Sequence, residues 1–334
     1  MRTLETTLRT DDQPAISRRN ILAMGLAAVA SPAVLAQDFP SRMIQIVVPY
    51  PPGGLTDNIG RLFASRMKEV LTQTVLVDNK PGAGASLGAG IAARAPADGH
   101  TLLLGSVGMV TNPFMFRSLP YKPEDFEPLM LTSLAPNVLY VHPSLPVKSV
   151  RELVEFAKKN PGMVSFASTG QGSSPHLAAA LFSSKAGISL LHVPYKGTAQ
   201  AITDVLGGQV QVYFDTMQSM QYVKEGKLRV LAVTTEKRLP SHPDLPTVEE
   251  SGVASGVVSS SWFGFFIHAK TPAAVQRQLA DSLLAIGRER DVQEKLVNMG
   301  VIPAMLNTAA FDQFFKRESA KWGEVIRTLN IRAD

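Results

Sequence analysis

The chain has 334 residues, with 33 Lys and Arg against 28 Asp and Glu, so its formal net charge is a mild +5. It contains no cysteine, which excludes a disulfide framework and thiol chemistry. No block of consecutive basic residues marks a nucleic-acid or membrane surface, and we expect no nucleic-acid partner. A chain of about 300 residues can bury a large core and commonly divides into two domains.

Residues 1–36 have the pattern of a removable export signal. Arg18 and Arg19 supply the charged region, residues 21–30 form the apolar stretch, and Ala36 ends a short segment suited to cleavage. The apolar stretch is too short for a membrane span of about 20 residues. We therefore expect a periplasmic protein whose signal is cleaved near Ala36.

The export route stays open on the sequence. Residues 17–22 (SRRNIL) are similar to a twin-arginine signal, although Ile21 and Ala23 stand where that pattern prefers Phe and Lys. A general secretory signal with two adjacent arginines fits equally well.

Beyond the signal, apolar runs alternate with stretches of helical periodicity. We expect strands at 44–48, 75–77, 101–104, 138–141, 164–167, 190–193, 210–214 and 262–267, and helices at 57–71, 87–95, 150–160, 177–186 and 199–206. Past residue 267 we expect helices only, at 273–288, 292–299 and 310–329. This alternation predicts an α/β fold of mostly parallel sheets flanked by helices.

The helices expected at the C-terminal end must pack on a sheet, and the simplest arrangement places them on the first lobe. The chain would then cross into a second lobe near residues 137–142 and return near 260–267. We therefore expect lobe 1 to comprise 37–138 and 262–334, and lobe 2 to comprise 139–261. Two connections between lobes make a hinge beside an interlobe cleft.

Two glycine-rich loops each follow a predicted strand and open a predicted helix: residues 50–57 (YPPGGLTD) and 168–176 (STGQGSSPH). The first N–H groups of a helix lack internal partners and lie at the positive end of its dipole, so an anion is stabilised there. Neither loop contains Lys or Arg. With two further residues at strand ends, the candidate ligand-binding residues are Pro52, Gly53, Gly54, Thr56, Asp57, Ser106, Ser168, Thr169, Gly170, Ser173, Ser174 and Asp215.

Simpler roles compete with ligand binding at several of these positions. Thr56 and Asp57 could cap the helix that they begin, and an Asp57 carboxylate facing the cleft would repel a carboxylate ligand and favour an amine. Ser173 and Ser174 precede a proline suited to the first turn of a helix. His176 in that turn fits packing better than ligand contact.

A catalytic alternative is an exported serine hydrolase using Ser86 or Ser174. Residues 84–88 (GASLG) match the Gly-x-Ser-x-Gly pattern, but a nucleophile elbow places its serine directly after a strand, and residues 78–83 intervene here. The segment also misses the dinucleotide fingerprint, because Leu87 stands at the third glycine. The six histidines are scattered, so we expect neither a metal site nor a cofactor.

Several motifs together resemble the extracytoplasmic receptors of tripartite tricarboxylate transporters, the Bug family. They span the mature chain in order: 48–57 (VPYPPGGLTD), 79–84 (NKPGAG), 98–103 (DGHTLL), 173–178 (SSPHLA), 193–197 (VPYKG), 206–210 (LGGQV) and 245–248 (LPTV).

That resemblance implies a two-lobed, type II-like periplasmic binding protein without catalysis. Such receptors trap a small organic carboxylate, whether a dicarboxylate, an amino acid or an aromatic acid, and deliver it to integral-membrane transporter subunits. The family holds the ligand carboxylate with the loop after the first strand and its counterpart in the second lobe, which correspond here to 53–57 and 168–174. We expect a monomer.

Overall fold

A computed structural model describes residues 39–333, so the export signal predicted at 1–36 lies outside the described residues. The described residues from 42 onward form one compact unit that carries both sheets. In the described part of the chain, every helix is too short or too polar to serve as a membrane span.

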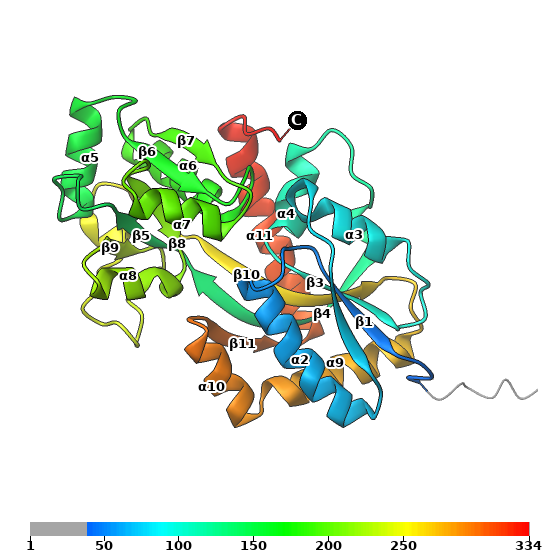
Figure 1. Ribbon diagram of the computed structural model, residues 1–334. Helices are drawn as coiled ribbons and strands as arrows, with labels where there is room; N and C mark the ends of the chain where they lie inside the picture. The colour runs from blue at the N-terminus through cyan, green and yellow to red at the C-terminus, as the bar shows by residue number, and fades with distance from the viewer. Residues whose placement is uncertain (1–38, 334) are drawn as a thin grey trace, which may run out of the picture. The chain divides into compact units, whose positions relative to one another are not determined.

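The first sheet has six strands in the order β11-β4-β10-β3-β1-β2 (Figure 1). Both β2 and β3 pair parallel with β1, whereas β10 runs antiparallel to β3 and β4, and β11 runs antiparallel to β4. Its strands are β1 (Ile44–Val48), β2 (Val75–Asn79), β3 (Thr101–Gly105), β4 (Phe126–Pro136), β10 (Ser260–His268) and β11 (Ile302–Leu306).

The second sheet has the order β7-β6-β8-β5-β9. Strand β6 pairs parallel with β7 and β8, whereas β5 runs antiparallel to β8 and β9. Alternate residues of β5 and β8 face two different apolar clusters, so this sheet is covered on both faces. Its strands are β5 (Val138–Val141), β6 (Ser165–Ser168), β7 (Leu191–Pro194), β8 (Val212–Asp215) and β9 (Arg229–Val233).

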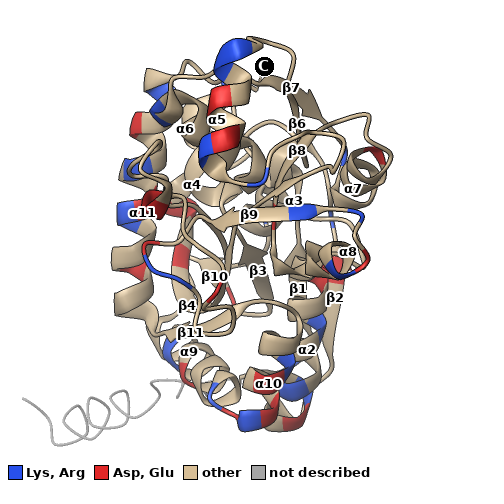
Figure 2. Cartoon of the chain, turned by 90° about the vertical axis from the view of Figure 1, so that its left-hand side faces the viewer, with Lys and Arg blue, Asp and Glu red and all other residues tan. Residues whose placement is uncertain are grey.

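Helices pack on both sheets. Those that pack with the first sheet are α2 (Leu55–Leu71), α3 (Ser86–Ala93), α4 (Gly108–Met115), α9 (Ala273–Gly287), α10 (Arg290–Asn298) and α11 (Thr308–Thr328). Those that follow strands of the second sheet are α5 (Val150–Lys159), α6 (Ser174–Ala186), α7 (Thr198–Leu206) and α8 (Met220–Lys224). Basic and acidic residues are interspersed along the outer helices α10 and α11 (Figure 2), in line with the mild net charge.

The expected α/β architecture is confirmed, but the expectation of mostly parallel sheets is wrong, because both sheets are mixed. Strand and helix alternate from β1 to β3 and from β6 to β8, and parallel pairing is confined to those runs. The long strands β4 and β10 pair with each other antiparallel. Antiparallel neighbours need no helical crossover, so the sequence rhythm does not reveal them.

The expectation that only helices follow residue 267 is also wrong, because β11 lies there. This strand contains Pro303 and a left-handed Met305, and its pairing with β4 is irregular. Within sheets, proline is found mainly on edge strands and at bulges, and β11 is an edge strand. The strand therefore lacks the alternating apolar pattern by which strands are recognised.

The chain passes between the sheets at Asn137, the single residue between β4 and β5. Its side-chain amide donates hydrogen bonds to Ser174 Oγ at 2.7 Å and Ser259 Oγ at 2.8 Å. Its backbone N–H donates to the Ser259 carbonyl at 3.2 Å, and its own carbonyl accepts from the Thr234 N–H at 2.9 Å. Ser259 immediately precedes β10, so the outgoing and returning connections are bonded to each other.

An aromatic cluster fastens α11 to β10. The ring of Trp262 lies 5.9 Å from the ring of Phe311, which in turn lies 5.1 Å from Phe266. A side chain at Gly264 would start only 2.2 Å from the Phe311 ring, so the glycine lets the ring lie directly on the strand. The buried rings hold the C-terminal helix on the first sheet.

We expect Phe311→Ala to lower the free energy of unfolding by about 3–5 kcal/mol, because it leaves a cavity between α11 and β10. Val297→Ala, at a side chain that is 55% exposed on α10, should change it by less than about 0.5 kcal/mol. Urea denaturation followed by circular dichroism measures both. Equal midpoints for the two variants would contradict the packing described.

Candidate functional site

The loop after β1 leaves the start of α2 open to solvent. Residues 51–54 are exposed, and Gly53 has a left-handed φ of 79°. Gly54 is the N-cap residue of α2 and carries no side chain to occupy the N–H groups of the first turn. Those N–H groups belong to Leu55, Thr56 and Asp57 and have no side-chain cap, which is the arrangement that favours an anion at a helix start.

The carboxylate of Asp57 is directed into the protein and is only 2% exposed. It accepts hydrogen bonds from the Gly53 N–H at 2.9 Å, from Arg61 Nε at 2.9 Å and from Asn79 Nδ2 at 3.0 Å. Burial alone would raise the pKa of Asp57, but the bonds from Arg61, Gly53 and Asn79 outweigh burial and lower it. Asp57 therefore anchors the loop as an ion-paired group.

The loop after β6 is held mostly by its own polar groups. Ser168 is fully buried, and its Oγ lies 2.7 Å from His192 Nε2 and accepts from the Gly170 N–H at 3.1 Å. Ser173 is the N-cap residue of α6, and its Oγ donates to the Gly170 carbonyl at 2.7 Å. Because Pro175 has no N–H, the first turn of α6 offers fewer donors than that of α2.

The remaining candidates fall into two groups by exposure. Pro52 is exposed and Thr169 is half-buried, so both can meet a ligand. Thr56, Ser106, Ser174 and Asp215 are buried. Ser174 Oγ accepts from Asn137, and the Ser106 side chain is hydrogen-bonded to Tyr50.

Asp215 ends β8 as a buried carboxyl group. Ser219 Oγ donates to it, and so does the backbone N–H of Thr216. Burial raises the pKa of Asp215, and these two hydrogen bonds offset only part of that effect. The carboxyl group is thus tied to the turn that follows its own strand.

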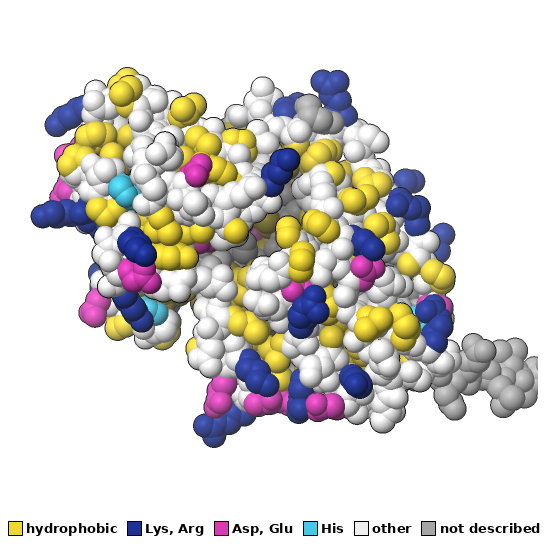
Figure 3. Space-filling model, in the orientation of Figure 1, with side chains coloured by type: hydrophobic (Ala, Val, Ile, Leu, Met, Phe, Trp, Pro, Cys, Tyr) yellow, Lys and Arg dark blue, Asp and Glu magenta, His cyan; other side chains and the backbone are white. Residues whose placement is uncertain are grey.

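Besides the bonds at Asn137, contacts at Gly172 and Gln218 join the parts of the molecule that carry the two sheets. Gly172 lies against α4, because a side chain there would start 1.9 Å from Met115 Cε. A second contact joins the segment after β8 to the end of α10, where Gln218 Nε2 donates to the Met299 carbonyl at 3.4 Å. The surface is hollowed between these two parts (Figure 3).

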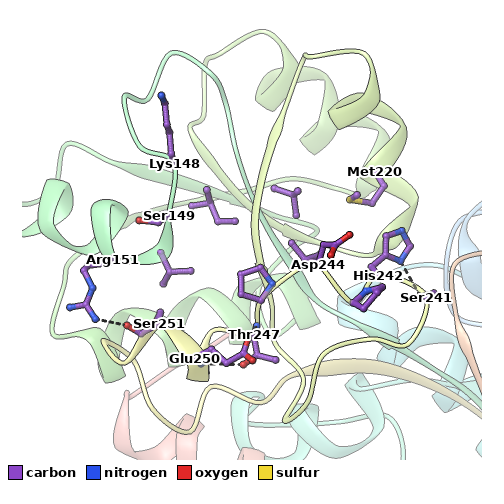
Figure 4. A pocket seen from close by; sticks show the side chains of 16 residues that line it. Lys148, Ser149, Arg151, Met220, Ser241, His242, Asp244, Thr247, Glu250 and Ser251 are labelled. Carbon is purple, nitrogen blue, oxygen red and sulfur yellow. Dashed lines mark hydrogen bonds between the residues drawn. The ribbon is translucent and has the colours of Figure 1, made fainter.

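Two cavities in the described residues lie away from both candidate loops. The larger, about 780 Å³, is an open groove on the second sheet beside residues 241–251 (Figure 4). The smaller, about 240 Å³, lies between α9 and the start of α11. Neither is lined by a candidate ligand-binding residue.

The geometry of the proposed nucleophiles does not match a hydrolase site. Ser86 follows β2 only after a loop and a 3-10 turn, and it is buried. Ser174 is bonded to Asn137. Within residues 39–333, imidazole rings contact Ser144, Ser168 and Ser241, and none of these is one of the two proposed nucleophiles. Within residues 39–333, no three His, Asp or Glu side chains gather as metal ligands would.

Sequence reasoning missed the residues that hold the loops from behind. Arg61 and Asn79 fix Asp57, Asn137 fixes Ser174, and His192 contacts Ser168. The spacing of Asp57 and Arg61, four residues apart on a helix, is the one signal that could have been read. The other partners are distant in sequence.

A family model and several solved structures match most of the chain. The family model described as "Tripartite tricarboxylate transporter family receptor" matches residues 59–331. The chain is 34% identical to the structure of R. palustris Rpa4515 with adipate, with a TM-score of 0.82, and the match covers 88% of this chain and 99% of that one.

Two further solved structures are similar over the same extent. The periplasmic binding protein BugD is 35% identical, with a TM-score of 0.79 and coverage of 88% and 99% of the two chains. MatC from Rhodopseudomonas palustris with bound malate is 28% identical, with a TM-score of 0.77 and coverage of 86% and 100%. The chain therefore belongs to the receptor family of tripartite tricarboxylate transporters, the Bug family, and has the two-lobed fold of periplasmic binding proteins.

Proposed function

We propose that the protein captures a small organic carboxylate between its two lobes and delivers it to the integral-membrane subunits of a tripartite tricarboxylate transporter. The relatives solved with adipate and with malate support a carboxylate ligand. The description of the family supports the transporter partner. The observation that carries the proposal is the exposed, uncapped start of α2.

Backbone groups supply the attraction at this seat. The nearby cations are engaged elsewhere: Arg61 with Asp57 at 2.9 Å, and Lys80 with Asp78 at 3.0 Å. Hydrogen bonds to a charged group contribute about 1.5–3 kcal/mol each. Several from the first turn of α2 reach the roughly 8 kcal/mol of a micromolar complex without an ion pair.

The second loop supplies the other side of the proposed site. Thr169 and Ser173 are partly exposed residues with hydroxyl groups, and α6 begins directly after Ser173. Adipate and malate each carry two carboxylates, so a second seat facing the first would suit such ligands. The proposed site thus keeps the predicted residues of both loops, with the buried ones in supporting positions.

The proposal also assigns the boundaries of the two lobes and the start of the mature chain. We assign 37–138 with 262–334 to lobe 1 and 139–261 to lobe 2, and the bonded connections at Asn137 and Ser259 to the hinge. Because members of the family include periplasmic binding proteins, we place the mature chain in the periplasm as a monomer that begins near Gln37. It acts without a cofactor.

We expect organic carboxylates to stabilise the mature protein and neutral sugars to leave it unchanged. Ligand at 100 times its dissociation constant adds about 2.7 kcal/mol to the free energy of unfolding. A thermal-shift panel of mono-, di- and aromatic carboxylates, with sugars as controls, measures this. Stabilisation by sugars alone would contradict the proposal, and consumption of the acid would indicate an enzyme.

Gly54→Val should weaken carboxylate binding more than Lys196→Met does. Gly54 has φ −77° and ψ 171°, which valine adopts readily, and a Cβ there would meet only the Pro51 carbonyl at 3.6 Å. The variant should therefore fold while its side chain obstructs the N–H groups of α2. Lys196 is an exposed loop lysine.

Isothermal titration of both variants with an acid from the panel decides between the two modes of binding, with circular dichroism as the folding control. If Lys196→Met abolishes binding while Gly54→Val binds normally, the carboxylate is held by an ion pair in the second lobe.

A further inference from the structure

Two histidines form a stacked pair behind the second loop. The rings of His176, on the first turn of α6, and His192, on β7, lie 4.1 Å apart with an interplanar angle of 6°. Phe166 of β6 extends the stack, 4.7 Å from His192. We call His176 and His192 the imidazole pair.

Each imidazole contacts one end of the turn formed by residues 168–172. His192 Nε2 lies 2.7 Å from Ser168 Oγ, at the point where β6 ends. His176 Nδ1 accepts a hydrogen bond from the Gly172 N–H at 3.0 Å. Between these points the Gly170 N–H donates to Ser168 Oγ. The pair therefore fixes the turn at its entrance and at its exit.

The hydrogen bond from Gly172 requires an unprotonated Nδ1 on His176. Burial, with a further contribution from His192, lowers the pKa of His176 to about 3, and burial lowers the pKa of His192 to about 4. No ion pair joins either ring to a charged side chain within residues 39–333. Both rings are thus neutral at neutral pH, and the acceptor is retained.

The far side of the turn faces the other part of the molecule. Gly172 has a left-handed φ of 68° and lies against Met115 and Thr111 of α4. A shift of the turn by one atomic diameter would change both this contact and the direction of its N–H groups. A precise anchor behind the turn is therefore needed if the turn is to meet a ligand.

We propose that His176 and His192 are positioning residues, which hold the turn 168–172 in the conformation that presents the second loop to the carboxylate. The inference rests on the proposed function, since it gives that site its support. In this role the imidazole pair acts from behind the turn and does not bind the ligand. Its effect passes through Ser168 and Gly172.

A matched pair of variants separates this role from simple packing. In His176→Asn the side-chain oxygen can replace Nδ1 as acceptor for the Gly172 N–H. In His176→Leu a side chain of similar size offers no acceptor. Both variants lose the stacked ring, so the difference between them isolates the hydrogen bond.

Amide hydrogen exchange of the ligand-free protein is the first measurement. We expect peptides covering residues 168–176 to exchange roughly tenfold faster in His176→Leu than in His176→Asn, because a buried N–H loses its acceptor. Titration with adipate and malate is the second measurement. The affinity of His176→Leu should fall by roughly tenfold relative to His176→Asn.

Equal exchange and equal affinity in the two variants would overturn the positioning role and leave the histidines as packing residues. If the wild-type protein binds no carboxylate, the proposed function fails instead. The exchange comparison is made without ligand, so it still decides whether the imidazole pair holds the turn.

Discussion

The hydrogen bonds to the carboxylate of Asp57 are the interaction on which the proposed site depends. They bring the Gly53 N–H, Arg61 and Asn79 to one buried group, and so join the loop, the helix α2 and the strand β2. The negative charge is neutralised inside the protein and does not face the cleft. The N–H groups of α2 are then free to attract an anion from outside.

The two loops are each anchored from behind, but by different chemical groups. The first uses a charged anchor that burial alone would disfavour and that Arg61 compensates. The second uses neutral imidazoles and a buried hydroxyl. In both, glycine lets the backbone turn and leaves space for a ligand, as Gly53 and Gly170 show by their positive φ. The anchors lie behind the loops, and neither loop itself contains Lys or Arg.

Much of the fold could be predicted, because its parallel portions have strong local patterns. The strand at 44–48 is apolar throughout, and the structure has it with the same bounds. The helix expected at 57–71 begins only two residues earlier. Strand β4, which pairs with β10 and β11 from distant parts of the sequence, and helix α4, with Pro113 inside it, have no comparable local signal.

At the candidate site, too, only features with a local sequence pattern could be predicted. Glycine-rich loops before helices can be recognised from a few consecutive residues, and most of the candidate residues were chosen in this way. The partner of each side chain depends on the fold, as for Ser174, which meets Asn137 from 37 positions away. His176 was expected to pack, and it does, but its hydrogen bond to Gly172 and its stacking on His192 appear only in three dimensions.

A crystal structure of the mature protein with a bound acid from the carboxylate panel tests the central claim most directly. The account predicts a ligand carboxylate oxygen at about 3 Å from backbone nitrogens in the first turn of α2, directly or through one ordered water. A carboxylate bound to the ammonium group of Lys196, or in the groove beside His242, would contradict it.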